Sequence, residues 1–216
     1  FGTISSTGFY TAPATVPTPA TFSVCAQSVQ TPANKGCINV TITDIPSAGG
    51  ELIVINDVNW ADNSYGTSQS GGVYGNPGNV QFIKNLVNFT PTGSRRTATK
   101  VMNMFDSFCC ENHSFGGKES GMAAIFQGEG YTPVQSTTHA DLLTIPSDVK
   151  LVLLVNPRSV FTNAEVNGLK TFASQGGRIV FVGEHSGYYG CCITSVENDF
   201  MTKMGSQMTN IGAVIS

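Results

Sequence analysis

The sequence is poor in charge: only 12% of its 216 residues are Asp, Glu, Lys or Arg, and the formal net charge is −3. A nucleic-acid surface needs clustered Lys and Arg, so this composition argues against nucleic acid as a partner. No apolar run approaches the roughly 18 residues that cross a bilayer, so we expect no membrane span. No signal-peptide pattern is present and the first residue is Phe1, which indicates a processed or excerpted chain.

Several ligand-binding motifs are also missing. There is no G-x-x-x-x-G-K-[ST] phosphate loop and no C-x-x-C-H word for haem attachment, so we expect no cofactor. Adjacent cysteines lack the C-x-x-C spacing that chelates one metal ion, and we expect no metal site. A zinc site that combines these cysteines with His113 or His185 is the alternative.

Six cysteines fall into three pairs along the chain. The even count, the low charge and the abundance of Thr, Ser, Asn and Gly are typical of an oxidising compartment, so we predict an extracellular or cell-surface protein. The second and third pairs predict two disulfides between them, or one disulfide with two spare thiols. The six residues are Cys25, Cys37, Cys109, Cys110, Cys191 and Cys192.

A hairpin is predicted near the amino terminus. Residues 21–26 alternate between polar and apolar, residues 34–36 (NKG) predict a turn, and residues 37–43 (CINVTIT) alternate again. Cys25 and Cys37 lie on the two arms, which predicts a cross-strand disulfide. Two unpaired buried thiols are the alternative.

The segment 150–187 organises the rest of the chain. Residues 151–155 (LVLLV) and 178–182 (RIVFV) are short apolar runs, typical of strands buried on both faces. Between them Thr162 predicts a helix N-cap, Glu165 completes a capping box, and a Gly pair ends the helix. Strand, helix and strand in this order predict a right-handed crossover between parallel strands.

Three ranges follow from these patterns: a small all-β segment at 1–45, a linker at 46–50 and an α/β domain at 51–216. The alternation of elements in the third range predicts a doubly wound, mainly parallel, flavodoxin-like sheet. Its further strands are predicted at 52–55, 100–105 and 132–135, its further helices at 79–88, 119–128 and 195–204, and another strand from Met208.

The amino-terminal segment resembles the C-terminal half of the bacterial immunoglobulin-like repeats of secreted and surface proteins. The resemblance rests on residues 2–5 (GTIS), 8–14 (GFYTAPA) and 40–42 (VTI). A whole sandwich takes about 100 residues, so the resemblance implies that the first strands are missing. Half a sandwich leaves an apolar face open, so we expect another polypeptide, or a removed part of the same one, to complete it.

Residues 51–216 resemble the class I glutamine amidotransferase-like superfamily, in the branch fused to immunoglobulin-like repeats in secreted bacterial proteins. Members usually continue past the position of Ser216, so the resemblance implies a domain truncated at its C-terminus. The matching words lie at 52–57, 60–61, 82–86, 162–165 and 176–185, with Leu169 and Phe172.

The enzymes of that superfamily carry a nucleophilic cysteine in a Gly-x-Cys-x-Gly turn. The corresponding word here is residues 183–187 (GEHSG), which places His185 at the nucleophile position. The resemblance therefore argues against amide transfer, and we favour a protein that is not an enzyme. A related sugar-utilisation branch also carries a Gly-x-His word, which keeps a link to carbohydrate open.

Candidate site residues follow the predicted strands. Asp57, Asp106, Asn156, Glu184 and His185 all lie at or just past the carboxyl end of a strand, where parallel sheets bind ligands. They predict either an oxygen-rich cation site or an acid/base cluster. The alternative is that they cap helices and fix loops, as Asp and Asn commonly do.

Two functions are compatible with these features. The favoured one is a non-catalytic secreted or cell-surface structural or binding module, part of an extracellular assembly, with a protein partner or self-association. The alternative is a secreted hydrolase that acts on carbohydrate or peptide through Glu184 or His185 with Asp57. Convergence of these side chains around a pocket would favour the hydrolase, whereas a filled crevice would favour the module.

Overall fold

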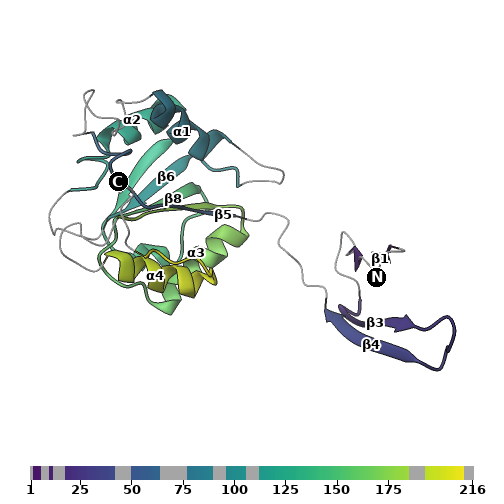
Figure 1. Ribbon diagram of the computed structural model, residues 1–216. Coiled ribbons are helices and arrows are strands. Elements are labelled where there is room, and N and C mark those ends of the chain that lie inside the picture. Colours follow the sequence, from purple (N-terminus) through teal and green to yellow (C-terminus); the bar gives the residue numbers. More distant parts are fainter. Residues whose placement is uncertain are drawn as a thin grey trace. The chain divides into compact units, whose positions relative to one another are not determined.

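The computed structural model, drawn in Figure 1, forms two compact units, Phe1–Ser47 and Ala48–Ser216. Within the described residues, no helix is both long and apolar enough to cross a membrane. The structure describes residues 2–5, 10–11, 18–41, 50–63, 77–89, 96–105, 112–184 and 193–211.

The first unit contains two small antiparallel pairs of strands. The shorter pair joins β1 (Thr3–Ile4) to β2 (Tyr10–Thr11). The longer pair is the predicted hairpin of β3 (Thr21–Gln27) and β4 (Lys35–Thr41). Cys25 lies directly opposite Cys37, and the predicted disulfide between them is confirmed.

The turn of this hairpin lies earlier than predicted. The Asn34 amide donates to the Thr31 carbonyl at 2.8 Å, so the tight turn spans 31–34. Lys35 and Gly36, predicted as turn residues, already pair with β3. Pro32 has no N–H and a fixed φ, so it suits the turn better than the ladder, and this preference decides the register.

The second unit is built on a five-stranded parallel sheet with the strand order β5-β9-β8-β6-β7. All five strands were predicted, and the parallel pairing of β8 with β9 is confirmed. Every residue of β9 is buried, as the apolar run 179–182 indicated, and the charged Arg178 at its start is buried with it. The strands are β5 (Glu51–Ile55), β6 (Lys100–Met104), β7 (Thr132–Ser136), β8 (Val149–Val155) and β9 (Arg178–Val182).

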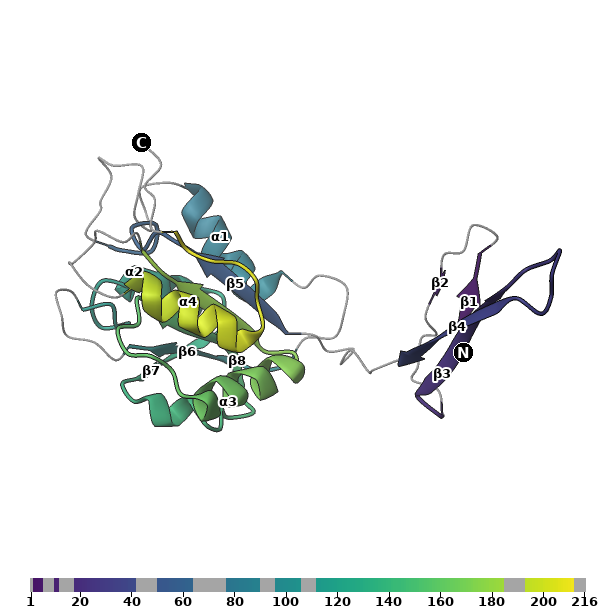
Figure 2. The same ribbon diagram turned by 60° about the horizontal axis from the view of Figure 1, so that its bottom comes forward.

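Helices cover both faces of the sheet, which confirms a doubly wound α/β unit and is consistent with a flavodoxin-like fold. Figures 1 and 2 show α1 (Pro77–Asn88) and α2 (Ser120–Gly128) on one face. The other face carries α3 (Asn163–Ser174) and α4 (Ile193–Met204), together with the short 3₁₀ helix η1 (His139–Leu142). Each face has its own apolar core.

The parallel strands β8 and β9 and the capped helix α3 between them form as the sequence predicts. The Glu165 amide donates to Thr162 Oγ1 at 3.3 Å, and the Thr162 amide donates to Glu165 Oε2 at 2.7 Å. This capping box fixes the first turn of α3. At the other end Gly176 has a φ of 85°, a left-handed conformation that favours glycine and ends the helix.

The strand predicted from Met208 does not form over its described part, because residues 206–211 are irregular; residues 212–216 lie outside the described residues. The Asn210 amide donates to Asn198 Oδ1 at 2.7 Å, and Asn198 Nδ2 donates to the Asn210 carbonyl at 2.9 Å. These two bonds hold the segment against α4 and use the backbone groups that a strand ladder would need. The sequence pattern did not reveal this competing contact.

The elements that follow neighbouring strands do not all lie on the same face of the sheet. The helices after β5 and β6 lie on the face of α1 and α2, whereas the elements after β7, β8 and β9 lie on the face of α3 and α4. The face therefore changes between β5 and β9, between β8 and β6, and between β6 and β7. Ligands of open α/β sheets bind beyond the carboxyl ends of strands at such points, so a site is expected at this edge.

Candidate functional site

Buried polar residues gather at the carboxyl edge of the sheet. Each of them lies in the last two residues of a strand or in the loop or helix that follows one, whereas Arg178 is buried at the opposite edge. Burying a polar group is costly unless it is bonded, so such a concentration needs a structural or functional explanation. The residues at the carboxyl edge are Asp62, Asn103, His113, Glu119, Ser136, Asn156, Glu184 and Glu197.

Glu184 and Asp57, two of the predicted site residues, follow the neighbouring strands β9 and β5. The Glu184 side chain is 4% exposed, and its Oε2 accepts a hydrogen bond from the Val58 amide at 3.4 Å. Asp57 is exposed, and its Oδ1 accepts from the Asn59 amide at 2.8 Å. Both carboxylates therefore bond the backbone of the loop after β5, and Glu184 links the end of β9 to that loop.

A third carboxylate, Glu197 of α4, lies near the end of β9 and was not predicted. Its Oε2 accepts from Asn210 Nδ2 at 2.8 Å. With the Asn56 amide nitrogen turned toward it, Asn56 donates to Glu197 Oε1 at 2.9 Å. Burial is the main cause that raises the pKa of Glu197, and the bonds from Asn210 and Asn56 oppose it.

Gly183 allows this arrangement. A Cβ at that position would overlap Oε2 of Glu197, so only glycine lets α4 place its carboxylate against the end of β9. The glycine was read from the sequence as part of a nucleophile turn. Its observed role is close packing against Glu197, a contact that no local sequence pattern reveals.

Asn156, a predicted ligand-binding residue, directly follows β8 and has a backbone conformation that is rare for a residue with a side chain. Its φ is 50°, its amide donates to the Val182 carbonyl at 2.7 Å, and its side chain is 2% exposed. Among the described residues, neither Oδ1 nor Nδ2 of Asn156 has a hydrogen-bond partner. Asn tolerates the left-handed region better than most residues, which explains its presence there.

A buried histidine and glutamate pair lies in the segment after β6. His113 Nδ1 lies 2.8 Å from Glu119 Oε1, and the two side chains are 3% and 0% exposed. Asn103 of β6 donates from Nδ2 to the His113 carbonyl at 2.9 Å and so anchors the segment. Burial raises the pKa of Glu119, and the bond to His113 opposes this effect.

The His113–Glu119 pair resembles the base and orienter of a catalytic site, but a second buried ion pair beside it has a structural role. Next to it Lys118 Nζ bonds buried Asp62 Oδ2 at 2.8 Å, which ties the loop after β5 to the start of α2. The sequence identified His113 only as a member of an alternative zinc site. A Glu six residues after a His gives no periodic signal, so the pairing could not be predicted.

Several predicted residues lie outside the described part of the chain: Asp106, His185, Cys109, Cys110, Cys191 and Cys192. Within the part that is described, no group of three or more His, Cys, Asp or Glu has the geometry to hold a metal ion. Two hollows of about 470 and 460 Å³ lie elsewhere on the second unit, one beside α3 and one between β5 and α1.

Comparison with protein-family models gave no match, and comparison with curated proteins gave none either. Among solved structures, the chain is similar to one described as "mmIFT52 N-terminal domain", with 20% sequence identity and a TM-score of 0.34. The similarity covers 46% of this chain and 42% of that chain. It is too weak to support a conclusion about fold or function.

Proposed function

We propose that the protein is a non-catalytic secreted or cell-surface module that belongs to an extracellular assembly, in which another polypeptide completes its amino-terminal β segment. The observation that carries this proposal is the apolar face of the β3–β4 hairpin. In its register Phe22 faces Val40 and Val24 faces Ile38, so the four side chains share one face. Ile38 is 68% exposed.

The opposite face of the hairpin is polar and internally bonded. Ser23 Oγ donates to Asn39 Oδ1 at 2.8 Å, and the Cys25–Cys37 disulfide lies on the same side. A hairpin with one polar and one apolar face normally packs its apolar face on a second layer. A two-stranded sheet alone is marginally stable in water, so a covering layer would also stabilise it.

The resemblance to half of an immunoglobulin-like repeat supports the same proposal. In a whole sandwich the second sheet covers such a face, and here that sheet would come from another polypeptide. The disulfide supports an oxidising and therefore extracellular setting. For the second unit, we infer an amidotransferase-like domain that serves as a scaffold for binding.

The carboxyl edge supports a non-catalytic role for the second unit. A general acid or base must reach the substrate proton, but Glu184 is buried and bonded to the backbone of Val58. Glu197 is likewise enclosed by Asn56 and Asn210. The hydrolase alternative would require Glu184 to leave this contact before it could act with Asp57.

A pair of variants on adjacent residues tests the proposal. Ile38→Asp places a charge on the apolar face, and Asn39→Asp places the same charge on the polar face while keeping an acceptor for Ser23. We expect Ile38→Asp to weaken the association of the chain into larger species at least about tenfold, as measured by light scattering. We expect Asn39→Asp to leave this association unchanged. Equal association of the two variants would contradict the proposal.

A further inference from the structure

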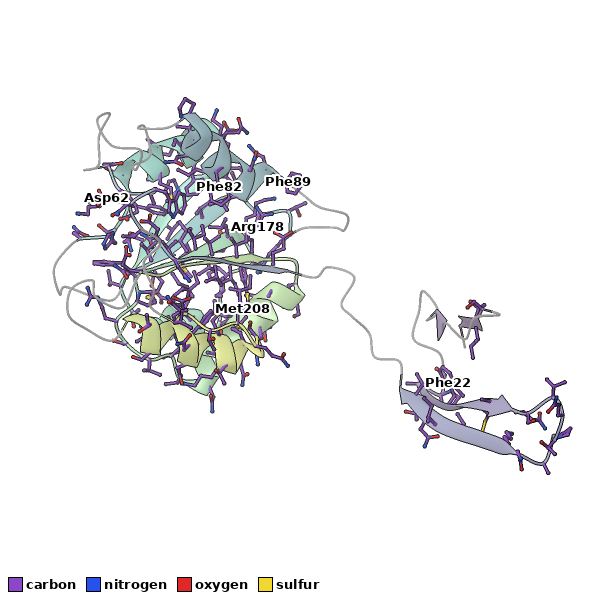
Figure 3. All side chains as sticks on the ribbon, in the orientation of Figure 1. Phe22, Asp62, Phe82, Phe89, Arg178 and Met208 are labelled. Carbon is purple, nitrogen blue, oxygen red and sulfur yellow. A yellow bond between two sulfur atoms is a disulfide. The ribbon has the colours of Figure 1, made fainter. Side chains whose placement is uncertain are left out.

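A lysine and an aspartate form an enclosed pair on the face of the sheet that carries α1 and α2. Lys118 Nζ lies 2.8 Å from Asp62 Oδ2, and the two side chains are 20% and 0% exposed. Figure 3 marks Asp62 on that face, where Val58 and Ala61, its neighbours in the chain, belong to the apolar core beneath the two helices. The pair joins two segments that are 56 residues apart in the sequence.

This pair differs from the other lysine–carboxylate pairs within the described residues. The carboxylates of Glu129, Asp148 and Asp199 are 23%, 48% and 36% exposed, so water solvates them. Asp62 has no such contact with water. Removing a carboxylate and an ammonium from water is costly, whereas an amide carries no net charge and is buried at a much lower cost. Burial therefore favours a neutral, covalently joined form of Lys118 and Asp62 over two charges.

Glu119 places a second buried carboxyl group next to the pair. Its side chain is 0% exposed, Oε1 lies 2.8 Å from His113 Nδ1, and Oε2 is buried without a hydrogen-bond partner among the described residues. Burial is the main cause that raises the pKa of Glu119, and the charge of nearby Asp62 adds to it. A raised pKa brings a carboxyl group closer to the neutral range, in which a general acid or base works best.

Main-chain hydrogen bonds hold the two segments on either side of the pair. The Asn63 amide donates to the Lys118 carbonyl at 2.8 Å, and the Lys118 amide donates to the Asn112 carbonyl at 2.9 Å. The Asn63 side chain accepts from the Gly121 amide at 3.0 Å and also bonds Ser120. The amine and the carboxyl group are therefore kept in contact, and fixed proximity of this kind accelerates a reaction between two groups by several orders of magnitude.

We propose that Lys118 and Asp62 form an intramolecular isopeptide bond. Nζ of Lys118 attacks Cγ of Asp62, so that a C–N bond forms and one C–O bond of the carboxyl group breaks. One ammonium and one carboxylate become one amide and one water molecule, so atoms and charges balance without an oxidant or any other reactant. Glu119 carries protons from the amine to the oxygen that leaves as water, and it ends in the state in which it began.

The bond links the loop after β5 covalently to the segment that precedes α2. It is a reaction of the chain with itself and involves no turnover of a substrate. The inference concerns the second unit and does not depend on the hairpin of the first. Because the mass of a single chain does not depend on association, the tests of the isopeptide bond and of the proposed assembly give separate results.

The intact mass of the unaltered chain tests the inference without any substitution. After complete reduction of the disulfides, we expect a mass about 18 Da below the value calculated from the sequence, because one water molecule has left. Trypsin should then release one branched peptide that contains both Asp62 and Lys118, since an amide-linked lysine has lost the charge that the protease recognises. The full calculated mass, with normal cleavage after Lys118, would overturn the inference.

A matched pair of variants identifies the reacting amine. Lys118→Arg keeps a positive charge beside Asp62, but the delocalised guanidinium is not a nucleophile, so this variant should show the full calculated mass. Lys84→Arg is the control, because Lys84 pairs with the more exposed Glu129, and it should lack one water molecule as the unaltered chain does. A loss of water that persists in Lys118→Arg would place the reaction elsewhere in the chain and overturn the inference.

Glu119→Gln tests the proton carrier. Glutamine keeps the shape of the side chain and can still bond His113, but it cannot take up a proton. The purified variant should therefore contain chains of full mass, while circular dichroism shows the same secondary structure as the unaltered chain. Complete loss of water in folded Glu119→Gln would overturn the role given to Glu119 in the reaction.

Discussion

The two units of this chain achieve order in opposite ways. In the second unit, every residue of β9 is buried and two apolar cores close both faces of the sheet. In the first unit, no residue of β3 is buried, and one disulfide joins the hairpin. The comparison teaches that the described sheet of the second unit is covered on both faces by its own helices, whereas the described hairpin of the first unit has no buried residue in β3, which is why we propose a covering layer for it.

The largest expected effect on stability is at Arg178 of the second unit. Arg178→Met leaves Glu51 and the carbonyls at the end of α1 without their buried donor, and we expect a loss of about 3 to 5 kcal/mol in the free energy of unfolding. Lys100→Met is the control, because the Lys100–Asp148 pair is exposed to solvent and such a pair contributes little to the free energy of unfolding. Urea unfolding followed by circular dichroism measures both, and equal losses would contradict the account.

The next largest effect on stability is expected in the first unit. Replacing Cys25 and Cys37 together by Ser removes a cross-link that closes a short loop, and we expect the hairpin to lose about 3 kcal/mol. The second unit should unfold at an unchanged temperature, because the two units are compact separately. Calorimetry resolves the two transitions; a parallel shift of the second one would show that the units are coupled.

A pH-dependent effect is expected at Glu197. Burial raises the pKa of Glu197, so the folded protein keeps this proton at higher pH than the unfolded chain does. Its contribution to stability therefore falls as pH rises above the ordinary value of 4.5. Glu197→Gln cannot ionise and can still bond Asn56 and Asn210. It should raise the melting temperature near about pH 8 but not near about pH 4. An equal shift at both pH values would argue against this origin.

The smallest effect is expected at Asn156, whose left-handed backbone limits what can replace it. Asn156→Gly relieves the backbone and removes an amide that lacks partners among the described residues. Asn156→Ala removes the same amide but keeps a Cβ, so it should be less stable than the glycine variant by about 1 kcal/mol. Thermal unfolding compares them, and an alanine variant of equal stability would contradict the conformational argument.

Much of the fold of the second unit could be predicted because its strands and helices have strong local signals. The apolar run at 151–155 and the Thr162–Glu165 capping box each specify their element without help from distant residues. The hairpin turn was misplaced because Gly36 suggested a turn as strongly as Pro32 did. The irregular segment 206–211 is held by hydrogen bonds to Asn198, and no local sequence pattern indicates this tertiary contact.

The candidate site was less predictable for the same reason. Chain position places Asp57 and Glu184 at strand ends, but it cannot tell whether a carboxylate faces a crevice or a backbone amide. Glu197 enters through α4, and His113 meets Glu119 through a loop, so both depend on packing between elements. Chain position therefore predicts which residues lie at the carboxyl edge of the sheet, but it does not predict the contacts that their side chains make there.

Amide exchange in the intact 22.8 kDa chain, measured together with its mass in solution, tests the central claim most directly. The account predicts that the β3–β4 amides are protected only in species larger than the monomer, while the β8 amides are protected in every species. A stable monomer whose hairpin amides exchange as slowly as those of β8 would contradict it, because the hairpin would then need no second polypeptide.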